Sequence, residues 1–411
     1  MSLLRRADFR NFWAGQTISL VGDQVSLLAL PLVAVLVLDA GAAQMGYLGA
    51  AALFPHLLFS LPAGVWLDRV ARRRRIMIAA DLLRAVLLAS VPIAYALDAL
   101  TFAQLYGVAF LSGSLAVAFD ISYSTIFVSV IPRADYVQAN SLLNGSRSLS
   151  FVGGPSLAGF LVQLFGAPAT LLADAVSYLA SALFLGRVRA AEPPLEPEED
   201  GSVRARVAEG MRFIAHHAIF RPSLAAVATI NLFNFMFFAL FVLYATRDLG
   251  IEPGTLGLVL GAGAVGSILG AVVASRIGRR LGIGGAFALG CVLFPAPLLL
   301  VPLAGGPRWL VLAMLFAAEF LSGLGVMILD INVGAIIPAL TPHRLRSRAT
   351  GAFRFVNYGV RPLGALIGGA LGSAIGLRPT LWIATAGAVA GVFWLLPSPV
   401  PALRELPEEA L

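Results

Sequence analysis

Three aspartates stand deep inside long apolar stretches of this chain, where acidic side chains are rare. They are Asp23, Asp120 and Asp330. A charged side chain at the centre of a lipid bilayer costs about 2.5 kcal/mol or more, so it needs a partner, a water-filled cavity or a task. A partly desolvated carboxyl group can bind and release a proton near neutral pH. We therefore take these three acids as candidates for proton coupling.

Asp23 has the position best suited to that chemistry. It lies 11 residues into the apolar run 12–38. That is about 17 Å of helix, close to mid-depth in a bilayer. The alternative is a structural acid that is hydrogen-bonded to Asn231, Asn234 or another polar group.

Asp120 and Asp330 occupy matching places in two sequence repeats. Arg147 and Arg354 also match each other, so each acid has an arginine that could neutralise it. Such symmetry favours a shared structural role, and substrate or proton handling is the alternative.

Polar residues in other apolar runs are candidates for a substrate cavity: Asn231, Asn234, Asn357, Arg361 and Glu319. Arg361 stands near the middle of its run beside Asn357, so it could hold a carboxylate or an anionic substrate. Weaker candidates, which could equally be packing or helix-end residues, are Glu319, Asp174 and His56. Asp81 and Arg84 are three residues apart, and that spacing predicts a structural pair along one helix face.

The elements that must position these residues are membrane-spanning helices. The chain of 411 residues is 59% hydrophobic and 12% charged, whereas an ordinary soluble domain carries about 25% charged residues. Crossing the hydrocarbon takes about 20 apolar residues. Twelve runs near or above that length lie at 12–38, 44–67, 76–97, 103–130, 139–165, 170–187, 219–246, 255–275, 283–303, 309–338, 350–373 and 380–397. We therefore predict an all-α membrane protein with twelve transmembrane helices.

The twelve runs fall into two related halves. Phe119-Asp120-Ile121 matches Leu329-Asp330-Ile331, and Pro132 matches Pro342 at the same separation of 210 residues. Repeats of this kind indicate two pseudo-symmetric six-helix bundles with a substrate site between them. An acidic, proline-containing segment between the halves indicates a linker. The predicted domains are an N-terminal bundle at 1–187, a cytoplasmic linker with a short interfacial helix at 188–218, a C-terminal bundle at 219–397 and a cytoplasmic tail at 398–411.

The placement of arginine predicts the orientation. All 29 basic residues are arginine, and with the amino terminus inside only Arg247, Arg308 and Arg378 fall in external loops. Basic loops stay in the cytoplasm, so both termini should be cytoplasmic in a multi-pass protein of the cell inner (plasma) membrane. The net charge of +7 is explained by this topology and by anionic lipid headgroups, and not by nucleic-acid binding.

Two motifs carry a family resemblance. The loop Gly64-Val-Trp-Leu-Asp68-Arg69-Val-Ala71-Arg72-Arg73-Arg74-Arg75 resembles the G-x-x-x-D-R-x-G-R-R signature of the major facilitator superfamily, with Ala71 in place of the second glycine. Residues 150–159 resemble its fifth-helix antiporter signature, G-x-x-x-G-P-x-x-G-G, through a segment that contains Gly153, Gly154, Pro155 and Gly159. Further matches near 9–13, 209–213 and 353–362 resemble the bacterial branch that includes enterobactin exporters and macrolide-efflux proteins.

The resemblance implies a conformational gate and a direction of transport. The loop acid Asp68 would dock near the eleventh helix and stabilise the outward-open state. The other residues of this gate are Gly64, Arg69, Arg72 and Arg73. The fifth-helix motif implies antiport and favours export over uptake. One departure is that the fourth run lacks the arginine that many drug–proton antiporters of the superfamily carry there.

We predict a secondary transporter that exports a small amphipathic or hydrophobic compound, a drug or specialised metabolite, by proton antiport and alternating access. The alternatives are uptake or flipping of a lipid-like substrate, and a non-transporting membrane receptor. We predict that the chain is not an enzyme, because the sequence has no G-x-x-x-x-G-K-[ST] nucleotide loop and only four histidines. With Cys291 as the single cysteine, we expect no metal or other cofactor. The expected form is a monomer whose partners are the substrate, protons and the bilayer.

Overall fold

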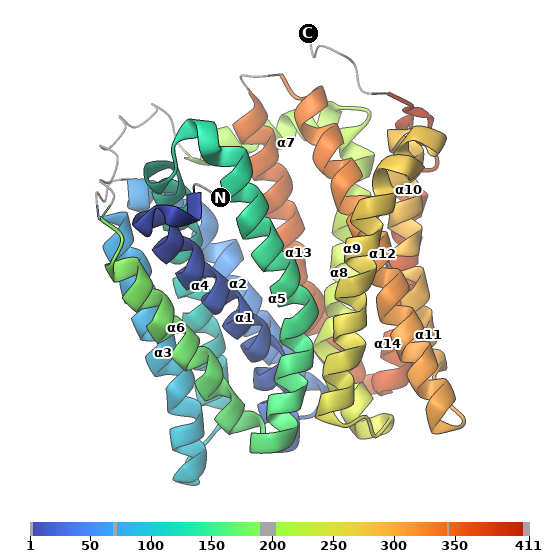
Figure 1. Ribbon diagram of the computed structural model, residues 1–411. Coiled ribbons are helices and arrows are strands. Elements are labelled where there is room, and N and C mark those ends of the chain that lie inside the picture. Colours follow the sequence, from blue (N-terminus) through green and yellow to red (C-terminus); the bar gives the residue numbers. More distant parts are fainter. Residues whose placement is uncertain (1–2, 69–71, 190–202, 343–344, 406–411) are drawn as a thin grey trace. The chain divides into compact units, whose positions relative to one another are not determined.

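The computed structural model describes residues 3–68, 72–189, 203–342 and 345–405, which form helices joined by short loops (Figure 1). The first half contains α1 (Ala7–Leu36), α2 (Ala42–Asp68), α3 (Arg73–Ala96), α4 (Phe102–Val130), α5 (Tyr136–Phe165) and α6 (Ala167–Gly186). The second half contains α7 (Val203–His216), α8 (Phe220–Leu243), α9 (Pro253–Leu281), α10 (Ile283–Leu293), α11 (Leu300–Leu303), α12 (Arg308–Leu340), α13 (Arg346–Ile375) and α14 (Leu377–Ala390). No strand occurs among the described residues, and the prediction of an all-α protein is confirmed.

Many of these helices are suited to a bilayer. In the described part of the chain, nine candidate spans are long and apolar enough to cross a membrane. The count of twelve stays a prediction, because the other expected spans fall on α2, α13 and α14. Helix α13 carries several arginines, and α14 has only 14 residues, fewer than the roughly 20 that a full crossing requires.

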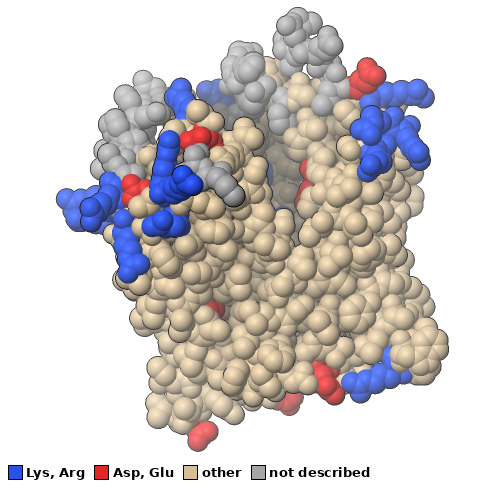
Figure 2. Space-filling model, viewed as in Figure 1, with Lys and Arg blue, Asp and Glu red and all other residues tan. Residues whose placement is uncertain are grey.

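Large apolar side chains point outward from these helices. Leu27, Val86 and Leu149 are 67%, 67% and 75% exposed, which water would disfavour and lipid would not. In Figure 2 most arginine side chains gather near the helix ends, and the middle of the visible face is almost free of charge. This distribution is that of a protein surrounded by hydrocarbon.

Proline and glycine set several helix ends. The predicted run 283–303 is not one α-helix: α10 ends at Leu293, and a 3-10 turn at Ala296–Leu299 leads into α11. Pro295 and Pro297 lack the backbone N–H that an α-helix needs there. Gly166 and Gly376 separate α5 from α6 and α13 from α14 at φ +81° and +91°. These two glycines are 210 residues apart, in the register of the sequence repeat.

The chain forms two compact units. The first unit is Met1–Ala40, Ala51–Glu199 and Ile251–Gly261, and the second unit is Gly41–Ala50, Asp200–Gly250 and Ala262–Leu411. Helices α2 and α9 therefore contribute residues to both units.

Each unit has its own apolar core. In the first unit α1 packs against α5 and α6, and α3 packs against α4 and α6, around Phe12, Met77 and Leu185. In the second unit α8 packs against α13 and α14, and α10 against α12. Helix α7 packs on α13, where Arg348 forms an ion pair with Glu209.

Candidate functional site

Polar residues from four helices meet inside the first unit. The contacts of α1 with α6, of α3 with α6 and of α3 with α4 bring them together. We call them the Arg84 cluster, and its members are Asp23 (α1), Asp81 and Arg84 (α3), Asp120 (α4), and Asp174 and Tyr178 (α6).

Asp23 is held by a tyrosine. The Tyr178 hydroxyl donates a hydrogen bond of 2.5 Å to Asp23 Oδ1. Tyr178 is 5% exposed and Asp23 is half-buried. This contact holds the Asp23 carboxyl group beside α6.

Arg84 lies against the same tyrosine. Its guanidinium carbon is 5.0 Å from the centre of the Tyr178 ring and 5.8 Å from that of Phe119. Arg84 is 6% exposed, and its Nε donates to the Ser112 carbonyl at 3.3 Å. Tyr178 therefore links the acid on α1 with the cation on α3, through a hydrogen bond on one side and a cation–π contact on the other.

Asp81 and Arg84, the predicted structural pair on α3, interact through their charges but share no hydrogen bond. Asp81 is fully buried. No described residue gives its oxygens a hydrogen bond of normal geometry, although the Ser181 side chain of α6 lies beside it. Arg84 turns toward α6 because the Tyr178 and Phe119 rings and the Ser112 carbonyl offer it contacts there. Asp81 shares Arg84 electrostatically with the other acids of the cluster.

Asp174 lies fully buried between α1 and α6. Its two oxygens accept hydrogen bonds from Ser177 Oγ, at 2.9 Å, and from Ser26 Oγ. Gly22 allows this close approach, because a Cβ there would overlap the Ser177 hydroxyl and the Asp174 carboxyl.

The residues of α6 in the Arg84 cluster follow a pattern that is visible in the sequence. Asp174, Ser177, Tyr178 and Ser181 recur at the spacing of one helix face within an apolar run. A polar stripe in such a run points into a bundle or a cavity. Tyr178 was missed because a lone tyrosine in an apolar run is ordinarily a packing residue.

Asp120 and Asp330 are both exposed, each beside an arginine. The charge of Asp120 interacts with those of Arg84 and Arg147. The charge of Asp330 interacts with that of Arg361 on α13, rather than with Arg354, which repeat symmetry had suggested.

The second unit places Arg361 in an aromatic setting. Its guanidinium carbon is 4.2 Å from the centre of the Tyr358 ring and 4.9 Å from that of Phe235. Arg361 also donates to Asn357 Oδ1 at 3.4 Å. The structure thus brings together Arg361, Asn357 and Asp330 of the predicted set.

The other predicted cavity residues differ in their hydrogen bonds and in their burial. Asn231 donates to the Val227 carbonyl of its own helix at 3.0 Å. Asn234 is 5% exposed, and its Oδ1 accepts no hydrogen bond from the described residues. Glu319 is 7% exposed on α12 and lies against Gly263 of α9.

The side chains of most predicted gate residues are not described by the structure. Arg69 is outside the described residues, and Gly64 and Asp68 belong to the last turns of α2, whose side chains are not described. Arg72 is exposed before the first residue of α3, and Arg73 is 6% exposed.

The antiporter-type motif forms a close helix contact. On α5, Gly159 approaches the start of α9, where a Cβ on Gly159 would overlap the Pro253 carbonyl and lie 3.0 Å from Gly257 Cα. A Cβ on Gly154 would overlap Gln24 of α1. Pro155 lies inside α5, with its carbonyl against Gly257. Glycines of this kind allow backbones to touch in a membrane.

We expect Gly159→Ala to lower the stability of the protein, while the matched change Gly153→Ala does not. A Cβ at Gly153 meets nothing within 4 Å, whereas overpacking a tight contact costs about 1–3 kcal/mol. Thermal unfolding in detergent measures both. Equal midpoints for the two variants would show that the α5–α9 contact is not tight.

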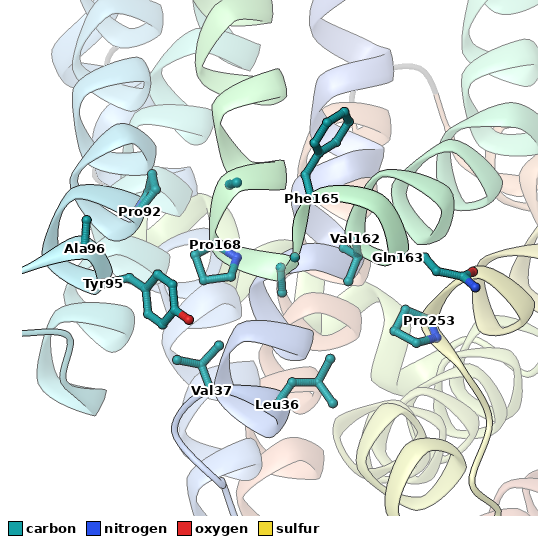
Figure 3. Close-up of a pocket in the computed structure, with 13 residues that line it drawn as sticks. Leu36, Val37, Pro92, Tyr95, Ala96, Val162, Gln163, Phe165, Pro168 and Pro253 are labelled. Carbon is teal, nitrogen blue, oxygen red and sulfur yellow. The ribbon is translucent and has the colours of Figure 1, made fainter. Parts of the chain in front are cut away.

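A cavity of about 580 Å³ in the first unit lies away from the Arg84 cluster (Figure 3). The side chains around it come from the ends of α1, α3, α5 and α6 and from Pro253, and they are apolar apart from Gln163 and the Tyr95 hydroxyl. No predicted site residue lines this cavity, so it does not serve the chemistry expected of the acids.

Known proteins resemble the chain over nearly its whole length. The model of a family described as transmembrane secretion effector matches residues 1–410. The multidrug efflux pump Tap of Mycolicibacterium fortuitum is 28% identical over 410 residues, covering 94% of this chain and 93% of the pump. Tap of Mycobacterium tuberculosis (strain H37Rv) is 29% identical over 409 residues, with 94% and 91% covered.

Solved transporter structures share the fold. A bacterial homologue of the iron transporter ferroportin, in an inward-facing state, has a TM-score of 0.79 at 17% identity and covers 97% of this chain and 99% of its own. The nucleoside transporter NupG has a TM-score of 0.74 at 13% identity, with 95% and 98% covered. At these identities the likeness concerns the fold alone.

Proposed function

Because this chain belongs to the transmembrane secretion effector family of the major facilitator superfamily, we propose that it exports small amphipathic or hydrophobic compounds, drugs or specialised metabolites, from the cell. The family and the relatives are transporters, which confirms the prediction that the chain is not an enzyme. Similarity to multidrug efflux pumps over 94% of the chain is the observation that carries the proposal.

Proton antiport drives this export. The Arg84 cluster supports the idea, because the carboxyl groups of Asp23, Asp81 and Asp174 share one buried arginine. Carboxylates that lie close together in a poorly solvated site cannot all be ionised cheaply. A proton that binds to one of them relieves that repulsion.

Asp23 is the member that exchanges its proton with water. It is half-buried, while Asp81 and Asp174 are fully buried. When Asp23 is ionised, the Tyr178 hydroxyl donates to it. When Asp23 is protonated, that hydrogen bond weakens. The Tyr178 ring is then free to move relative to the Arg84 guanidinium that lies over it. Proton binding on α1 thereby changes the contact between α6 and α3, which is a local event that can bias alternating access.

We also propose the membrane topology that the sequence predicts. Twelve spans form an N-terminal bundle at 1–187 and a C-terminal bundle at 219–397, with the linker 188–218 and both termini in the cytoplasm. The distribution of arginine supports this orientation. Membrane-impermeant labelling of single cysteines placed at Arg75 and Ala99 checks it, since these positions should face opposite sides.

The purified protein in liposomes with an acidic interior tests the function. We expect ethidium, a fluorescent amphipathic cation, to accumulate in the liposomes, and we expect an ionophore that collapses the pH gradient to stop the accumulation. Protein-free liposomes are the control. Movement of a fluorescent phospholipid without the dye would instead support lipid flipping, and dye binding without accumulation would support a receptor.

A further inference from the structure

A buried carboxyl group lies between α9 and α12 in the second unit. Glu319 of α12 is 7% exposed, and its Oε1 has no hydrogen-bond partner among the described residues. A Cβ added to Gly263 of α9 would lie 3.2 Å from both the backbone oxygen and Oε2 of Glu319. The acid is therefore pressed against the backbone of the neighbouring helix.

The helix contact around Glu319 is built from glycine. A Cβ on Gly266 of α9 would overlap the Phe320 carbonyl, and one on Gly323 of α12 would overlap the Gly263 carbonyl. Ser267 Oγ donates hydrogen bonds of 3.1 Å to the carbonyls of both Gly263 and Gly323. Backbones this close leave no room for a hydrated counter-ion beside the carboxyl group.

Charged groups on the surrounding elements are far from Glu319. Arg308 and Asp330 are each 11 residues away on α12, or about 16 Å of helix. On α9 the nearest arginine, Arg276, is 13 residues from Gly263, or about 20 Å. Helix α10 contributes only the Cys291 thiol as a titratable group, and α11 and the turn before it contribute none.

We propose that Glu319 is a second proton-binding site, separate from the Arg84 cluster. An ionised carboxylate buried without a partner is so costly that such a group binds a proton instead. Glu319 therefore holds a proton while α9 and α12 pack as they do here. When this contact opens to water, the O–H bond breaks, the electron pair stays on the carboxylate and the proton passes to a water molecule. The part that this proton plays in export rests on the proposed function, but its presence does not.

Infrared spectroscopy of the purified full-length protein tests the protonation without any transport. We expect Glu319→Gln at neutral pH to lose a C=O band of a protonated carboxyl group. The matched change Glu405→Gln, at an exposed acid, should lose carboxylate bands instead. Loss of carboxylate bands from Glu319→Gln would overturn the proposal.

Isotope-labelled glutamate in the unmodified protein gives the same answer if Glu319→Gln is not recovered. Glu319 is the one glutamate of the described chain that is buried, since Glu252 and Glu405 are exposed and the Glu209 side chain is 47% exposed. Among the described glutamates, only Glu319 is therefore expected to give a protonated carboxyl band at neutral pH. Its absence would contradict the proposal.

Proton counting in liposomes tests the role in coupling. We expect Glu319→Gln to reduce the protons released per exported ethidium by one. If the infrared band is lost but the count stays the same, the proton is structural and Glu319 has no part in coupling. If no ethidium is exported even by the unmodified protein, the proposed function fails while the protonation of Glu319 stands.

Discussion

Asp23→Asn should reduce proton-driven export to the level of protein-free liposomes. Asparagine keeps the size of aspartate but carries no proton that it can release, so it holds the Asp23 position permanently in a neutral form. Tyr178 loses its carboxylate acceptor. Its contact with Arg84 can then no longer change with the binding and release of a proton at position 23. Substrate binding and downhill exchange should remain measurable, because neither needs a proton to be cycled.

Two measurements on the same preparation check this expectation. One is ethidium accumulation driven by a pH gradient, and the other is equilibrium binding of ethidium. Asp330→Asn, at an exposed acid outside the Arg84 cluster, is the control and should retain gradient-driven export. Full export by the Asp23 variant would remove Asp23 from the mechanism. Loss of export only in the control would move the coupling site to α12.

Tyr178→Phe separates the hydrogen bond from the ring. This change removes the donor to Asp23 but keeps the aromatic face beneath Arg84. If the hydroxyl only packs, export should be unchanged at every pH. If it stabilises the ionised form of Asp23, the pH dependence of export should shift to higher pH, because a carboxylate that loses a hydrogen bond binds its proton more readily.

Local patterns predicted most of the helices. The apolar run 139–165 corresponds closely to α5, which ends where Gly166 adopts positive φ. The run 283–303 was expected to be one helix, but the prolines after α10 divide it. The length and composition of an apolar run indicate whether the segment can cross a membrane. The point at which its helix is interrupted depends on single residues such as proline.

The site was harder to predict because its contacts are distant in sequence. Asp23 and Tyr178 are 155 residues apart, and no spacing rule connects them. The separation of three residues between Asp81 and Arg84 suggested a pair, but long-range contacts with α6 and α4 turn the arginine away. Charge inside an apolar run thus made Asp23 a candidate, while its contact with Tyr178 depends on the packing of α1 against α6.

Arg84→Gln should be among the most destabilising single changes in the first unit. Arg84 is the buried cation of a cluster whose acids include the fully buried Asp81 and Asp174. Removing one partner of a buried charge pair costs about 3–5 kcal/mol, because the other charge is left uncompensated. The contacts with the Tyr178 and Phe119 rings are lost as well.

Arg187→Gln is the matched control for this change. Arg187 also stacks on a ring, at 5.8 Å from the centre of Phe184, but it is exposed. A surface change of this kind is expected to alter stability by no more than about 0.5 kcal/mol. Thermal unfolding in detergent should therefore show a large drop for Arg84→Gln and almost none for Arg187→Gln. Equal, small effects would mean that Arg84 does not hold the cluster together.

The double variant Arg84→Gln, Asp81→Asn tests whether charge is the cause. If the loss of Arg84 acts by leaving acids uncompensated, neutralising Asp81 should restore part of the lost stability, since one carboxylate no longer repels the others. If the loss acts only through the ring contacts, the second change should bring no recovery. Arg84→Lys completes the comparison, because it keeps the positive charge but not the planar group that stacks on Tyr178. Recovery in the double variant, together with a milder effect for lysine, is the result expected if Arg84 is the shared counter-ion of the acids in the Arg84 cluster.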